Sequence, residues 1–214
     1  MDRTEAPSPY ELAQRQGQEV LRRTLLDAAS RLLVTEGPQA LTMRRVAAAV
    51  GCSTTVLYTA FGSKDGLAEA LFLEGFQRLR RRLEAVPSGG DPLARLRALA
   101  DAYRDSALES RSYYGVMFQQ AIPGYRPSAA SLATAGASLE VLTDAVRACM
   151  DAGVLRAGDP RAVAEVLWAA VHGAVSLELA GHLPDPEVAA DRFRTLAAAA
   201  ALPFLNESPR PRRP

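Results

Sequence analysis

The sequence predicts an all-helical protein, and three observations support that fold class. Apolar residues recur at helical spacing along most of the 214-residue chain, whereas strand patterns are nearly absent. Three segments begin with the same Asp-Pro pair, at Asp91, Asp159 and Asp185. Aspartate can accept hydrogen bonds from the free amides of a helix start, and proline needs no donor there. Apolar residues make up 48% of the chain, enough for a buried core, and the 23% of charged residues argues against disorder.

The first residues predict an N-terminal arm. The stretch 1–18 is polar and charged, so we expect no signal peptide. Within it, Ser8-Pro9-Tyr10-Glu11 has the spacing of a capping box and predicts a short arm helix that Gly17 weakens. From Val20 the apolar pattern is regular, and Gly37-Pro38 ends a helix whose predicted core face consists of Leu21, Leu25, Ala28, Ala29 and Leu32.

Residues 41–64 predict two short helices that are joined by a tight turn. Thr42 can cap a helix over about 43–50, and Gly51 can end that helix in the left-handed conformation. Ser53 can cap a second helix over about 54–61. Two helices of about two turns, joined across a glycine, are what a helix-turn-helix requires.

The next helix follows at once. Gly62 closes the second short helix, and Ser63 can cap a long helix from Lys64 to about Val86. The arginine run at 78–82 lies far from the start of that helix, so we expect a solvated face there rather than a DNA contact.

Polar side chains on the outer faces of these helices predict contact with double-stranded DNA. In a helix-turn-helix the second helix enters the major groove with its N-terminal residues nearest the bases. Threonine and serine can contact base edges, while helix starts and basic side chains bind phosphates. The formal net charge of the chain is only +1, so this prediction depends on position and not on bulk charge. The predicted contacts are Ser53, Thr54, Thr55 and Thr59 to bases or phosphates, and Thr42, Arg44, Arg45, Tyr58 and Lys64 to phosphates.

These segments resemble the N-terminal domain of the tetracycline-repressor (TetR) family. The resemblance implies an all-helical homodimer with a ligand-responsive C-terminal body, usually a repressor that a small molecule releases from DNA. Two positions depart from the family pattern: Ala60 stands where many members carry an aromatic residue or histidine, and Arg45 where many carry an acidic residue. The resemblance covers about 20–72 and rests on the segments Leu26–Leu33, Glu36–Gly37, Leu41–Ser53, Val56–Tyr58 and Phe61–Lys64, and on Leu67.

The remainder predicts a helical bundle. Apolar stripes that begin at Leu93 and Leu132 predict two long helices, with a short aromatic helix over about 112–121 between them. A further helix from Pro160 to about Gly181 is apolar on nearly every side and must be covered all round, either by a partner subunit on one side or wholly inside a monomer. Its apolar run, 166–177, is short of the roughly 20 residues of a membrane span.

Two aromatic segments of the body, 113–118 and 168–179, resemble the regulatory domain named for its Trp-His-Gly signature. They predict an apolar effector pocket with a few polar groups, lined by Tyr103, Tyr113, Tyr114, Met117, Phe118, Met150, Trp168 and His172. The alternative is a packed core in which His172 is a buried histidine with its hydrogen bonds satisfied. Gly173, which weakens a helix, suggests a close helix crossing at a dimer seam, and the predicted dimer interface is Val171, Gly173, Val175, Leu179, Phe193, Ala197 and Ala200.

We therefore expect a cytoplasmic, sequence-specific DNA-binding transcriptional regulator, a ligand-responsive repressor that binds a palindromic operator as a homodimer. The expected organisation is an arm at 1–17, a helix-turn-helix domain at 18–72, a helical effector-binding and dimerisation domain at 73–205, and a flexible basic tail at 206–214. We expect no cofactor and no membrane partner, only a small apolar or amphipathic effector.

Other classes fit less well. An enzyme is disfavoured because the chain has only two histidines, His172 and His182, and no catalytic motif. Cys52 and Cys149 lie too far apart in sequence for a zinc motif or a disulfide framework, so no metal site is expected. The remaining alternative is a helical protein-interaction module that does not bind DNA.

Overall fold

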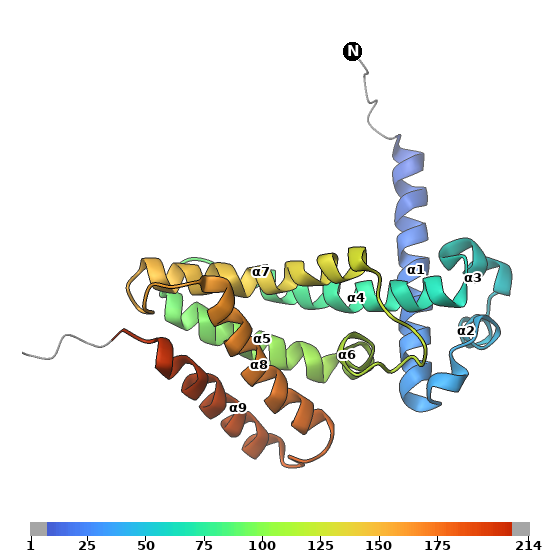
Figure 1. Ribbon diagram of the computed structural model, residues 1–214. Coiled ribbons are helices and arrows are strands. Elements are labelled where there is room, and N and C mark those ends of the chain that lie inside the picture. The colour runs from blue at the N-terminus through green and yellow to red at the C-terminus, as the bar shows by residue number, and fades with distance from the viewer. Residues whose placement is uncertain (1–7, 207–214) are drawn as a thin grey trace, which may run out of the picture.

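A computed structural model describes residues 8–206, and over that range it is all-helical, as predicted. Figure 1 shows α1 to α3 at one end of the molecule and α5 to α9 at the other, with α4 running between them alongside α7. The helices are α1 Pro9–Thr35, α2 Met43–Val50, α3 Thr54–Phe61, α4 Lys64–Glu84, α5 Pro92–Glu109, α6 Arg111–Phe118, α7 Ala129–Asp151, α8 Pro160–Leu179 and α9 Pro186–Ala201.

The helix-turn-helix forms as its capping residues predict. The Thr42 hydroxyl accepts a hydrogen bond from the Arg45 amide, and Gly51 ends α2 in the left-handed conformation with φ +74°. Ser53 precedes α3 but makes no side-chain capping bond, contrary to prediction. The turn into α4 needs a glycine that the sequence analysis overlooked, because a Cβ on Gly66 would lie 2.0 Å from the Phe61 carbonyl oxygen.

The expectation of a separate short arm helix is wrong, because α1 runs unbroken through Gly17 for 27 residues. The predicted capping box is present, with the Ser8 amide donating to Glu11 Oε2 at 2.7 Å and the Glu11 amide donating to Ser8 Oγ at 3.3 Å. This cap supports a helix that tolerates one glycine at a cost of about 1 kcal/mol. Residues 8–21 are exposed, so Leu21 is not part of the core face that the sequence predicted.

Two apolar cores share α4, whose first half packs into one and whose second half packs into the other. The core of the helix-turn-helix domain contains Leu25, Leu57 and Leu67, and that of the body contains Val146 and Phe193.

The tail residues 207–214 and the arm residues 1–7 lie outside the described range, so the predictions for them stay predictions. Asn206, placed in the predicted tail, donates its backbone amide to the Val154 carbonyl at 3.0 Å and is therefore held against the body.

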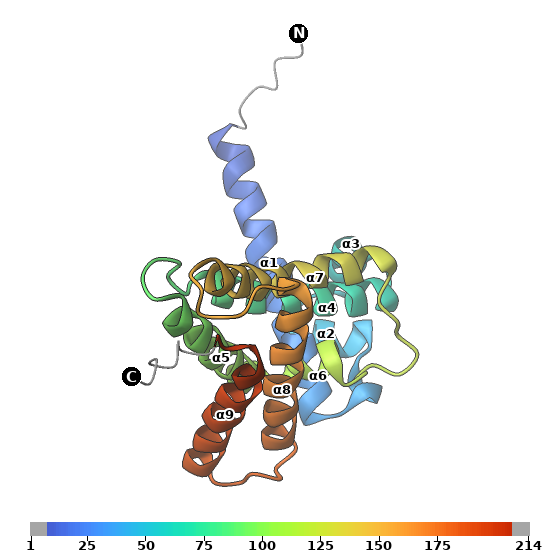
Figure 2. The ribbon, with the colours of Figure 1, turned by 60° about the vertical axis from the view of Figure 1, so that its left-hand side comes forward.

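The body helices begin at the predicted aspartates. The carboxylates of Asp91, Asp159 and Asp185 accept hydrogen bonds from the amides two residues further on, at 3.0, 2.9 and 2.9 Å. The 20-residue helix α8 contains an 18-residue window with a mean hydropathy of 1.4, so by length and composition it could cross a membrane, which the shorter run 166–177 did not suggest. In the fold it packs between α7 and α9 (Figure 2).

Candidate nucleic-acid interface and ligand cavity

The outward face of α3 carries the residues that were predicted to contact bases. Leu57 and Phe61 are buried against α1 and α4, which fixes the side of α3 that faces outward. On that outward side Tyr58 is 53% exposed. Of the four hydroxyl-bearing residues, Thr54 is half-buried, and the exposed ones are Ser53, Thr55 and Thr59. Because Ser53 makes no capping bond, its hydroxyl can bond a base or a phosphate.

The residues predicted to bind phosphates surround this face but are not equally available. Arg44 and Lys64 are exposed at the starts of α2 and α4, where the helix dipole also favours an anion. Thr42 uses its hydroxyl to cap α2. Arg45 donates two hydrogen bonds to Glu36, one of them 2.9 Å from Nε to Oε2. A phosphate would therefore have to compete with that carboxylate. The hydrogen bond from Arg45 holds the pKa of Glu36 below its usual value.

Arg22 on α1 contacts the C-terminal end of α3, a role that the sequence analysis missed. Its guanidinium donates to the Ala60 carbonyl at 3.1 Å and lies 4.9 Å from the centre of the Phe61 ring. A tie between residues 38 positions apart has no local sequence signal. It fixes α3 to α1 at the position where the chain departs from the family pattern.

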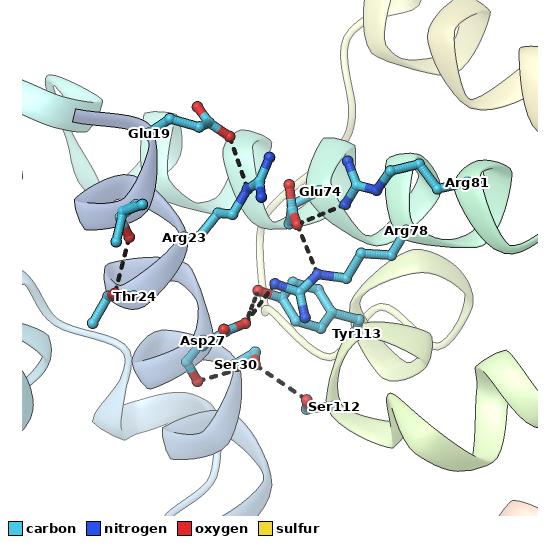
Figure 3. A network of polar contacts seen from close by, with 11 residues as sticks. Glu19, Arg23, Thr24, Asp27, Ser30, Glu74, Arg78, Arg81, Ser112 and Tyr113 are labelled. Carbon is cyan, nitrogen blue, oxygen red and sulfur yellow. Dashed lines mark hydrogen bonds and ion pairs between the residues drawn. The ribbon is translucent and has the colours of Figure 1, made fainter. Parts of the chain in front are cut away.

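A polar network joins the helix-turn-helix domain to the body (Figure 3). Arg78 of α4 donates to Asp27 of α1 at 2.7 Å and to Glu74 at 2.7 Å, and its guanidinium lies 4.4 Å from the centre of the Tyr113 ring of α6. The Tyr113 hydroxyl also donates to Asp27, at 2.9 Å. Glu74 is only 6% exposed, and Arg81 contacts it as well, at 3.3 Å.

Arg78 therefore does not lie on a solvated face, as the arginine run suggested, because Asp27, distant in sequence, meets it. The neighbouring arginines are exposed, and Arg80 and Arg82 pair with Glu84 and Glu109. Tyr113, which was predicted to line the effector pocket, belongs to this network and does not line the body cavity.

The body contains a cavity of about 640 Å³ between α4, α5, α7, α8 and α9. Of the predicted pocket residues, Tyr103, Phe118 and Trp168 line it. Tyr114, Met117, Met150 and His172 do not. The sequence analysis missed leucines of α4 and α5, including Leu79 and Leu96, because helix periodicity shows a buried face but not the space that it encloses.

His172 is half-buried, and its Nδ1 has hydrogen-bond partners within the chain. Its Nδ1 lies 2.8 Å from the Tyr103 hydroxyl and 2.9 Å from the Tyr114 hydroxyl. Tyr114 also contacts the Ser176 hydroxyl, at 2.8 Å. Burial lowers the pKa of His172 and raises that of Tyr103, so it favours the neutral form of both groups.

The residues predicted for the dimer interface fall on two sides of α8 and α9. Val171, Val175 and Phe193 are buried within the chain and cannot meet a partner, because the apolar core of the body uses them. Leu179, Ala197 and Ala200 are half-buried. Gly173 is exposed, and a Cβ there would meet nothing within 4 Å, so no helix of this chain crosses it closely. The exposed side of α8 instead presents Ala162, Val166, Ala169, Gly173 and Leu177.

Comparison with known proteins identifies two family domains in this chain. Residues 25–71 match the family described as bacterial regulatory proteins, tetR family. Residues 96–200 match the domain described as tetracyclin repressor-like, C-terminal domain. The Trp-His-Gly type of that domain stays a prediction, because the description does not name it.

Whole-chain similarities extend over both domains. An HTH-type transcriptional regulator of Mycobacterium tuberculosis, Rv1816, is 27% identical over 86% of this chain and 94% of its own. A solved protein of unknown function from Rhodococcus sp. RHA1 is 27% identical, with a TM-score of 0.69 over 93% of this chain and 98% of its own. The TetR family transcriptional regulator PfmR from Thermus thermophilus is 24% identical and shares the fold, with a TM-score of 0.66 over 86% of this chain and 99% of its own.

Proposed function

This chain belongs to the tetR family of bacterial regulatory proteins and is a DNA-binding transcriptional regulator, and on that premise we propose that it is a repressor that binds a palindromic operator as a homodimer. A small apolar or amphipathic molecule in the body cavity releases it from DNA. The observation that carries this proposal is the outward face of α3, which is rich in hydroxyl groups and is backed by the buried Leu57 and Phe61.

The test measures binding to the DNA upstream of the chain's own gene at several salt concentrations. Phosphate contacts release counterions, so affinity falls steeply with salt, whereas a protein-interaction module would show little dependence on salt. We expect Lys64→Ala to weaken binding to all operator sequences alike and to reduce the salt slope by about 1. Tyr58→Ala should also weaken binding uniformly, because its hydroxyl reaches a phosphate.

Replacements at Thr54 and Thr55 should instead change which bases are preferred, by about 1–3 kcal/mol at the contacted positions. Arg111→Ala, at an exposed position on α6, is the matched control and should leave binding unchanged. Unaltered binding in both the phosphate and the base variants would show that α3 is not the reading helix.

The proposed dimer forms through the exposed side of α8 and the neighbouring part of α9. Val166 and Leu177 are 50% and 52% exposed on α8, and Leu196 is 40% exposed on α9. Exposed apolar side chains of this kind favour burial against a partner. Pairing would place the two α3 helices on half-sites about 34–36 Å apart along DNA.

Sedimentation of full-length variants tests the dimer. Val166→Glu and Leu177→Glu should each give monomers that lose operator affinity, since a buried unpaired charge opposes association. Leu132 is 55% exposed on a different helix, α7, which is not part of the proposed interface, so Leu132→Glu should remain dimeric. A dimer that survives both α8 substitutions would rule out this interface.

A further inference from the structure

The interior of the body cavity is almost wholly apolar. Its deep wall is formed by buried apolar side chains such as Leu79, Leu99 and Phe193. The two hydroxyls that line it each have a partner in the chain: Ser138 donates to the Ala135 carbonyl at 2.7 Å, and Tyr103 contacts His172 at 2.8 Å. Trp168 adds one indole N–H, which can only donate. Over residues 8–206, the buried side-chain atom that lacks a hydrogen-bond partner is Arg95 Nε, and Arg95 does not line the cavity.

A ligand that enters this space must therefore be apolar over the part that is buried. Most polar groups placed in the interior would lose their water without gaining a hydrogen-bond partner, and a charge there would be more unfavourable still. Any polar end of the ligand must stay at the exposed part of the lining. The cavity volume of about 640 Å³ falls in the range that holds a drug-sized molecule.

The exposed part of the lining is positively charged. Its charged residues are Arg97 and Asp101 on α5, Arg161 on α8 and Arg194 on α9, which is three arginines against one carboxylate. Arg161 is held by ion pairs with Glu140 and Glu165. Arg97 and Arg194 are exposed and form no ion pair with any residue in the range 8–206.

From this arrangement we infer that the effector is an apolar organic acid, with its hydrocarbon or aromatic body in the cavity and its carboxylate at Arg97 and Arg194. Arginine binds a carboxylate through two parallel hydrogen bonds, which suits a head group at the edge of an apolar space. The chemistry of the ligand rests on the proposed ligand response, but it can be tested separately from DNA binding.

Trp168 is the only tryptophan of the chain and lines the cavity, so its fluorescence reports binding to the full-length protein. The probes are decanoate, 1-decanol and decylammonium, each used below its micelle concentration, because they share one hydrocarbon body and differ only in head group. Decanoate should bind more tightly than decanol by about threefold and than decylammonium by about tenfold, as expected for exposed ion pairs. Equal affinities, a preference for either other probe, or no binding would overturn the inference.

Two variants test the position of the carboxylate. Arg97→Gln and Arg194→Gln should each weaken decanoate binding by about threefold and leave decanol binding unchanged. Arg192→Gln is the matched control, since Arg192 is exposed on the same helix but does not line the cavity. If Arg192→Gln weakened decanoate binding as much as Arg194→Gln, a general surface charge would explain the preference and the inference would fail.

Operator binding separates this inference from the proposed function. If decanoate binds in the cavity but does not release the operator, the ligand response fails while the assignment of ligand chemistry stands. If decanol releases the operator and decanoate does not, the regulatory function stands and the organic acid is the wrong class.

Discussion

The substitution Arg78→Met removes the guanidinium that joins α1, α4 and α6, and the structure predicts its cost. Glu74 is 6% exposed and would lose a hydrogen bond of 2.7 Å, keeping only the Arg81 contact at 3.3 Å. Asp27 would lose its own 2.7 Å bond to Arg78 and keep the Tyr113 hydroxyl at 2.9 Å. Methionine keeps most of the aliphatic length of arginine and removes the guanidinium from the Tyr113 ring, so the change is mainly one of charge.

Removing one partner of a fully buried ion pair costs about 3–5 kcal/mol. Arg78 is 28% exposed and Asp27 36%, and both carboxylates keep a second partner, so solvent screening reduces the expected loss to about 2 kcal/mol. For a chain of this size that loss lowers Tm by about 4–8 °C. Thermal unfolding at a fixed protein concentration measures it, because dimerisation makes Tm depend on concentration.

Two further variants make this prediction refutable. Arg80→Met removes an ion pair with Glu84 whose partners are 50% and 47% exposed, and should cost less than about 0.5 kcal/mol. The double variant Glu74→Gln/Arg78→Met should recover part of the lost stability, since the more buried of the two carboxylates is then uncharged and only the partly exposed Asp27 lacks its arginine. If Arg78→Met is no more destabilising than Arg80→Met, the network does not stabilise the fold by pairing buried charge.

Three other outcomes are expected. Burial lowers the pKa of His172 below its ordinary 6.5, so the stability that the neutral imidazole contributes is complete above pH 6.5 and is lost as the pH falls toward the folded pKa. Between about pH 7.5 and 5.5, the Tm of His172→Gln should therefore fall by less than the Tm of the parent chain. Burial raises the pKa of Cys149 and shields its sulfur, so a thiol reagent should modify the partly exposed Cys52 in the folded protein and Cys149 only after denaturation, and rapid double modification of the folded chain would contradict this. Leu57→Ala should cost about 3 kcal/mol by leaving a hole behind α3, and should weaken operator binding together with stability in a melting experiment.

Local signals predicted the helix-turn-helix well because the residues that begin and end its helices act on groups close to them in sequence. Thr42, Gly51 and Ser63 each act on amides or carbonyls within a few residues, so the limits of α2, α3 and the start of α4 follow from residue identity. The same logic failed at Gly17, where a single glycine was expected to weaken the helix but α1 runs through it. It also missed Gly66, whose role depends on the return of the chain to the Phe61 carbonyl.

The roles of the charged side chains were harder to predict because they depend on partners far along the chain. Arg45 forms a hydrogen bond with Glu36, and Arg78 forms one with Asp27, which lies 51 positions earlier in the chain. Periodicity identified α8 as apolar on every side but assigned Val171 and Val175 to the wrong side, because both faces of such a helix have the same composition. The cavity was predicted by its aromatic residues, yet much of its wall is aliphatic and comes from α4, α5 and α9.

The amino-acid sequence alone determined the all-helical class, the limits of the helix-turn-helix and the family. These depend on caps, turns and spacings that operate over a few residues. Only the tertiary structure decided which arginines lack an ion pair among the described residues, which face of α8 is exposed and where the body cavity lies. Those properties arise from packing between distant helices, where a side chain is buried or paired by residues that no local pattern identifies.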